Sequence, residues 1–164
     1  MRNSQNQFMR SLGYLDPHPD DQLYSALMLQ PRIVGGLTMI GLLLQTPWLF
    51  LALSAALWWS AFVPTRSLFD AIYNYVVAPH RGLAPLRAAP APRRFAGGLA
   101  GVVALAIGIA LLAGARSTAW VLEALLTAAV AAVVFGRSCA GADLYHVLRR
   151  RWSGEGRTAT VQHR

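Results

Sequence analysis

Apolar residues along this chain are gathered into two long blocks rather than spread over many short segments. The first block covers residues 33–63 and the second covers residues 95–135, and few charged residues interrupt either one. Blocks of about 18 or more apolar residues are typical of membrane-spanning helices. The pattern therefore predicts an all-α integral membrane protein.

Each block is too long for one helix across a bilayer, and each has turn-forming residues near its middle. The first block would make a helix of about 46 Å, whereas the hydrocarbon core is about 30 Å thick. Thr46 is placed to cap a helix that begins at Pro47. In the second block Gly114 suits a helix end, and Ser117 or Thr118 suits the next helix start. We expect two tandem transmembrane helical hairpins with helices over residues 31–46, 47–63, 94–113 and 117–137.

The polar segments divide the chain into further parts. A short helix over residues 19–30, capped by Asp20, is predicted in the N-terminal segment, and an amphipathic helix over residues 65–77 contains a possible ion pair between Arg66 and Asp70. Both helices suit the membrane surface. The expected organisation is an N-terminal segment (1–30), a four-helix transmembrane domain (31–152) and a tail (153–164). Within the transmembrane domain we expect hairpins over residues 31–63 and 94–137, a connector over residues 64–93 and a helical extension to residue 152.

The basic residues indicate which side of the membrane each segment faces. All fifteen are arginine, and fourteen lie before or at the entrance of the first hairpin, in the stretch that leads up to the start of the second, or at or after the end of the second. Only Arg116 lies in a hairpin turn. Since cytoplasmic loops carry an excess of basic residues, both termini and the connector are predicted to be cytoplasmic. Topology then explains the net charge of +8 without nucleic-acid binding. The acidic N-terminal segment, which lacks an early apolar run, does not resemble a cleaved signal peptide.

A short phrase is repeated at the entrance to both hairpins. PRIVGGL covers residues 31–37 and PRRFAGGL covers residues 92–99. Pro-Arg suits the membrane interface, and small residues one turn deeper let helix backbones approach closely. We expect the glycines to serve mainly the contact between the two hairpins. The candidate packing residues are Gly35, Gly36, Gly97, Gly101 and Gly108.

Few residues inside the predicted spans can carry chemistry. Glu123 is the one ionisable residue there, and we interpret it as an interfacial carboxylate near a helix N-terminus, with Arg116 nearby. A proton or substrate relay would need partners deeper in the membrane. The four histidines are predicted on the cytoplasmic side, so none is placed to ligate a haem at mid-depth. They are His18, His80, His146 and His163. We therefore predict no catalytic, cofactor or metal site.

The phrase FGRSCAGADLY at residues 135–145 joins the fourth predicted helix to a basic segment. Together with PRIVGGL, TPWLFLALSAAL and APRRFAGGL, it resembles domain of unknown function family 4395, a family of small bacterial membrane proteins, over roughly residues 30–148. Members tend to carry Cys-x-Gly-Cys at the end of the last span. Here Cys139 and Gly141 match, but Ala142 replaces the second cysteine. The resemblance implies a four-helix fold and supplies no activity.

These observations favour a non-catalytic accessory or structural subunit of a larger bacterial inner-membrane complex, for example a respiratory or photosynthetic one. The expected partners are membrane lipids and other membrane-protein subunits. Two alternatives stay open. One is a thiol-dependent membrane redox protein that uses Cys139 with a partner thiol, and the other is a small oligomeric transporter. The candidate partner contacts are the aromatic residues Trp58, Trp59, Phe69, Tyr73 and Tyr75.

Overall fold

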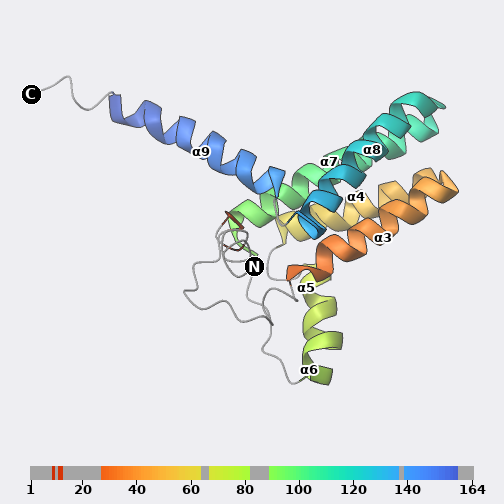
Figure 1. The fold of residues 1–164 in the computed structure, drawn as a ribbon, viewed down its shortest axis with the longest axis horizontal. Coiled ribbons are helices and arrows are strands. Elements are labelled where there is room, and N and C mark those ends of the chain that lie inside the picture. The colour runs from red at the N-terminus through yellow and green to blue at the C-terminus, as the bar shows by residue number, and fades with distance from the viewer. Residues whose placement is uncertain are drawn as a thin grey trace, which may run out of the picture.

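The computed structural model describes residues 9, 11–12, 27–63, 67–81, 89–136 and 139–158. This part of the chain is helical and contains no strand, in agreement with the predicted all-α class. The predicted helix over residues 19–30 falls mostly outside the described residues, as does Arg66. The helices are α3 (Leu29–Leu44), α4 (Pro47–Phe62), α5 (Leu68–Ile72), the π-helical η2 (Tyr73–Val77), α6 (Ala78–Arg81), α7 (Ala91–Leu112), α8 (Arg116–Val134) and α9 (Ala140–Thr158) (Figure 1).

Four of these helices form a bundle in which α4 packs along α7 and α3 packs along α8 (Figure 1). Their bounds lie within a few residues of the four predicted helices. Pro47 is the first residue of α4, and Gly114 adopts a left-handed conformation with φ 72° after α7. The predicted cap of α8 is wrong. That helix begins at Arg116, so Ser117 and Thr118 lie inside its first turn.

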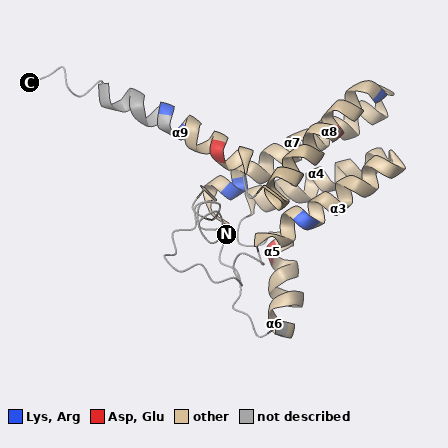
Figure 2. Ribbon diagram, viewed as in Figure 1, with Lys and Arg blue, Asp and Glu red and all other residues tan. Residues whose placement is uncertain are grey.

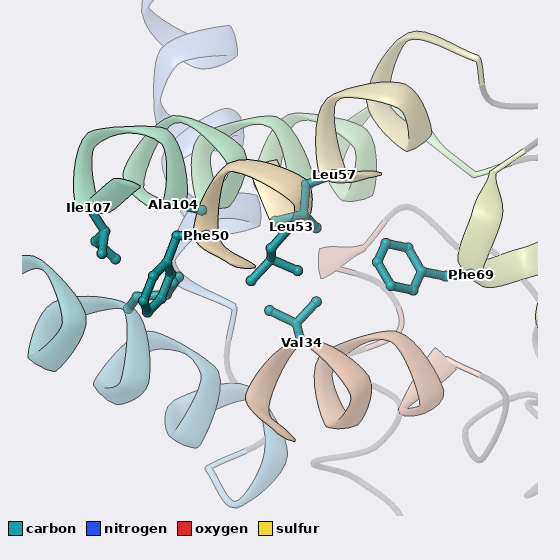
Figure 3. Packing of buried hydrophobic residues seen from close by; sticks show 8 residues of the cluster. Val34, Phe50, Leu53, Leu57, Phe69, Ala104 and Ile107 are labelled. Carbon is teal, nitrogen blue, oxygen red and sulfur yellow. The ribbon is translucent and has the colours of Figure 1, made fainter. Parts of the chain in front are cut away.

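Large apolar side chains from all four bundle helices meet in one core, which also includes a residue of α5 (Figure 3). Phe50 and Ile107 are completely buried. A Cβ atom added at Gly41 would lie 2.6 Å from the ring of Phe50, so this glycine lets the ring lie against the backbone of α3. The buried core residues are Val34, Phe50, Leu53, Leu57, Phe69, Ala104, Ile107 and Leu126.

The two halves of the bundle differ in helix length. Helices α7 and α8 are each long and apolar enough to cross a membrane. Helices α3 and α4 are also apolar but have 16 residues each, which corresponds to about 24 Å. A Cβ atom at Gly108 would lie 3.4 Å from the carbonyl oxygen of Pro47. The start of α4 is therefore level with Gly108, about 6 Å before α7 ends at Leu112.

The remaining helices leave the bundle at one end, where α3 and α7 begin and α4 and α8 end (Figure 1). The series α5–η2–α6 points in one direction, and α9 extends in another (Figure 1). Helix α9 continues past residue 152, the expected end of the helical extension, to Thr158. Arg32, Arg93 and Arg94 lie at this end of the bundle, whereas Arg116 lies at the opposite end (Figure 2).

Candidate functional site

A buried carboxylate lies beside the end of α3. Glu123 of α8 is only 1% exposed. The side-chain nitrogen of Gln45 lies 3.2 and 3.1 Å from its two carboxylate oxygens and 3.0 Å from the carbonyl oxygen of Leu42. The amide oxygen of Gln45 accepts a hydrogen bond from the indole of Trp120 at 3.3 Å. The side chain of Gln45 therefore gives hydrogen bonds both to a carbonyl group at the end of α3 and to the buried carboxylate of Glu123. Glu123 is thus buried inside the chain, and its partner Gln45 was not part of the interpretation of this residue as an interfacial carboxylate near Arg116.

Two threonine hydroxyls continue the polar residues along α3 and α8. Thr38 is 1% exposed, and its hydroxyl oxygen and that of Thr127 are buried without a hydrogen-bond partner among the described residues. Thr38 precedes Gln45 by two helical turns, and Thr127 follows Glu123 by about one turn. Helices α3 and α8, which pack along each other, therefore each carry a buried hydroxyl in addition to the Gln45–Glu123 pair that joins them.

A second polar cluster joins three helices at the basic end of the bundle. One guanidinium nitrogen of Arg93, in α7, lies 2.6 Å from a carboxylate oxygen of Asp70, in α5. The same nitrogen donates to the side-chain oxygen of Gln30, in α3, at 3.0 Å. The side chains of Arg93 and Asp70 are 8% and 10% exposed. Asp70 therefore pairs with an arginine 23 residues away in the sequence, whereas the sequence had suggested Arg66 as its partner.

Two of the candidate packing glycines bring α7 against α4. A Cβ atom at Gly101 would collide with the indole of Trp58, whose Nε1 would lie 2.7 Å away, and a Cβ atom at Gly108 would lie 2.7 Å from Leu51. The hydroxyl of Ser54 donates to the carbonyl oxygen of Gly101 at 2.8 Å. Helices α4 and α7 are thus held by close backbone approach together with an interhelical hydrogen bond.

The other three candidate glycines differ in their surroundings. A Cβ atom at Gly35 would lie 2.9 Å from a methyl group of Val130 in α8. One at Gly97 would lie 3.7 Å from the amide of Gln30, which is an ordinary contact. Gly36 has open space where its side chain would be, with no heavy atom within 4 Å. Only Gly35 among these three therefore requires a small residue for packing.

The five candidate aromatic contacts fall into two groups. Phe69 and Tyr73 are 5% and 4% exposed, and Phe69 belongs to the main core. They are therefore not available to a partner molecule. Trp58, Trp59 and Tyr75 are 38%, 52% and 82% exposed. The candidate contact surface is reduced to these three side chains.

Cys139 lies half-buried between α8 and α9, beside the fully buried Ala142. Burial raises the pKa of its thiol, and hydrogen bonds from the backbone of Ala142 and Gly141 oppose this shift only in part. A thiol with a raised pKa is mostly protonated at neutral pH and is a weak nucleophile. This environment does not favour a redox role for Cys139.

His146 lies in α9, close to the N-terminal part of the chain. Its Nε2 lies 2.8 Å from the backbone carbonyl oxygen of Ser11, and its ring packs edge-on against Tyr145. Among the described residues, no three His, Cys, Asp or Glu side chains are grouped so that they could hold a metal ion.

An apolar groove of about 510 Å³, not anticipated from the sequence, runs between α4 and α7 near the basic end. Among the described lining residues the one that is charged is Arg94, whose Nε donates to the carbonyl oxygen of Ala61 at 2.7 Å. Trp58 and Phe62, whose rings lie 5.4 Å apart, form one wall. The lining residues are Trp58, Ala61, Phe62, Ala91, Arg94, Phe95, Gly98, Leu99 and Val102.

The family described as Domain of unknown function (DUF4395) matches residues 28–150 of the chain, so the protein belongs to this family. The matched region begins one residue before α3 and covers the whole bundle and the first half of α9. No curated protein and no solved structure shows a significant match to the chain. The comparison establishes the family and brings no activity with it.

Proposed function

We propose that this member of the DUF4395 family is a non-catalytic, four-span protein of a bacterial inner membrane, built from two transmembrane hairpins with both termini in the cytoplasm. The observation that carries this proposal is the gathering of arginines and side helices at one end of an apolar bundle. Cytoplasmic ends of spans are enriched in arginine, and amphipathic helices at such an end suit the interface.

The exposed apolar side chains support the same orientation. Trp48 lies at the start of α4, and Trp59 and Phe62 lie at its end, and all three are more than half exposed. Aromatic side chains near both ends of a span suit the two headgroup regions. Helix α9 exposes Val147 and Leu148 beside its arginines, as expected for a helix that lies on a membrane surface.

The topology is tested by labelling single cysteines with a membrane-impermeant maleimide in a Cys139→Ala background. Ser117→Cys is exposed at the start of α8 and should react from the outer side of intact cells. Ala89→Cys precedes α7 and should react only after the cells are opened. The reverse pattern would reject the orientation, and recovery of the protein without membranes would reject the spans.

We further propose that the protein acts as an accessory subunit of a larger membrane complex. Of the candidate aromatic contacts, Trp59 and Tyr75 are more than half exposed and suit a partner surface, whereas Phe69 and Tyr73 are buried inside the chain. Large aromatic side chains often dominate the binding energy of interfaces.

The subunit proposal is tested by mild-detergent purification from the native membrane, followed by identification of co-migrating proteins. The Trp59→Ala, Tyr75→Ala double variant should stay folded and lose these proteins. Phe135→Ala removes a side chain that is 84% exposed at the end of α8 and serves as the matched control. Equal recovery of the partners with the double variant and the control would reject this surface.

The transporter alternative has one specific observation in its favour, the buried pair of Gln45 and Glu123, with unpartnered hydroxyls of Thr38 and Thr127 on the same two helices. Ionisable residues inside spans often mark ion pathways. Reconstituted vesicles containing a pH-sensitive dye would report proton movement. Transport requires a flux that is abolished by Glu123→Gln and retained by Ser60→Ala, which removes a hydroxyl that donates to the carbonyl oxygen of Ala56 within α4.

A further inference from the structure

The groove between α4 and α7 has an ordered polarity along its length. Arg94 and Ala91 lie at the basic end, in the first turn of α7. Val102 lies eight residues further along α7, or about 12 Å deeper in the bundle. Among the described lining residues beyond Arg94 the side chains are apolar, apart from the indole N–H of Trp58. One end of the groove is therefore cationic and the rest is apolar.

Arg94 differs from its neighbour Arg93 in what it contacts. Arg93 is buried and paired with Asp70, whereas Arg94 is half-buried and has no carboxylate partner among the described residues. The hydrogen bond from its Nε to the carbonyl oxygen of Ala61 fixes the guanidinium beside the groove. A guanidinium has five N–H donors, so this bond leaves others for an anion. The first turn of α7 adds the positive end of a helix dipole at the same place.

We propose that this groove binds one anionic phospholipid from the leaflet that meets the basic end of the bundle. The phosphate accepts hydrogen bonds from Arg94, and an acyl chain lies along Trp58, Gly98 and Val102. The proposal rests on the membrane location proposed above. Planar guanidinium groups match phosphate oxygens in a bidentate manner, and alkyl chains suit an apolar channel. The cation lies at headgroup level, and the apolar part runs toward the middle of the bilayer.

The charge and polarity of the groove favour a phospholipid over a partner helix or a quinone. A partner helix would need to place a carboxylate against Arg94 to satisfy it at that depth. A quinone would leave the cation without an anion, because its head carries neutral carbonyl groups. A phospholipid supplies the anion and the apolar chain in one molecule.

The test is native mass spectrometry of the full chain, purified in detergent and titrated with phosphatidylglycerol or phosphatidylcholine. The wild-type protein should bind one phosphatidylglycerol in preference to phosphatidylcholine. Arg94→Gln should weaken this first binding step roughly fivefold or more, since one cation near a membrane surface contributes about that factor. Arg32→Gln is the matched control, because Arg32 is exposed at the equivalent place in the other copy of the repeated phrase. It should leave the first step unchanged.

A second variant tests the apolar part of the site. Val102→Trp fills the deep end of the groove at an exposed position of α7, so it should reduce binding of both lipids while the melting temperature stays close to wild type. Equal effects of Arg94→Gln and Arg32→Gln would overturn the site in favour of general surface charge. Unchanged binding by Val102→Trp would overturn the position of the chain. A quinone or a protein recovered in the groove would also overturn the proposal. Any of these contrary results, obtained with a protein that is still extracted from membranes, would reject the lipid site and leave the membrane assignment intact.

Discussion

The buried pair between Arg93 and Asp70 gives a sharp test of what holds the side helices to the bundle. Asp70→Asn keeps the shape of the side chain and removes its charge. Arg93 then keeps a hydrogen bond to Gln30 at 3.0 Å but loses the negative charge of Asp70. Removing one member of a buried pair costs about 3–5 kcal/mol, because the other charge is left uncompensated. Since Gln30 and the asparagine oxygen still accept hydrogen bonds, we expect the lower figure, about 3 kcal/mol.

This loss is measured as the thermal midpoint of tryptophan fluorescence in detergent. For a chain of this length, about 3 kcal/mol corresponds to a decrease of roughly 6–12 °C. Asp143→Asn is the matched control, since Asp143 is exposed in the first turn of α9 and contributes no more than about 1 kcal/mol. The double variant Asp70→Leu, Arg93→Met should recover most of the loss, because both charges are removed together. A double variant as unstable as Asp70→Asn, or a decrease in that single variant no larger than in the control, would refute this account.

Gly101→Ala should lower the free energy of unfolding by about 1–2 kcal/mol, since overpacking against Trp58 outweighs the gain in helix propensity. Gly36→Ala should raise it by about 0.5–1 kcal/mol, because the added methyl meets open space; equal effects of the two changes on the thermal midpoint would contradict the packing assignment. Cys139 should react slowly with N-ethylmaleimide at pH 7, and its rate should still be rising above the pH at which a free thiol has ionised, because burial raises the pKa of the thiol. A rate that levels off below pH 8 would contradict that shift.

The helices could be predicted because their signals are local. Pro47 and Gly114 interrupt long apolar blocks, and they mark one helix start and one helix end within a few residues of the observed bounds. These signals act through backbone geometry, which depends on neighbours in the sequence. The prediction that Ser117 or Thr118 caps α8 was wrong, because the local sequence is compatible with more than one first residue of this helix.

The polar contacts could not be predicted in the same way. Gln45 and Glu123 lie 78 residues apart, and Asp70 and Arg93 lie 23 residues apart. Periodicity indicates the face of a helix on which a residue lies, but it does not indicate which helix that face meets. A useful signal was present, since Gln45 lies in the turn of one predicted hairpin and Glu123 lies near the turn of the other. The burial of Tyr73 was missed for the same reason, because an amphipathic segment can turn its apolar face toward lipid or toward its own bundle.

The difference in length between α3–α4 and α7–α8 has a consequence for the surrounding lipid. In the proposed membrane orientation, a bilayer would meet apolar helices of about 24 Å on one side of the bundle and helices of up to about 33 Å on the other. In that orientation lipids beside α3 and α4 would compress to match these short helices, and such thinning costs a fraction of a kcal/mol per Å. A second protein with equally short spans would share the thinned patch and relieve part of that cost. Hydrophobic mismatch would then gather neighbours beside α3 and α4 before any side chain of theirs makes contact.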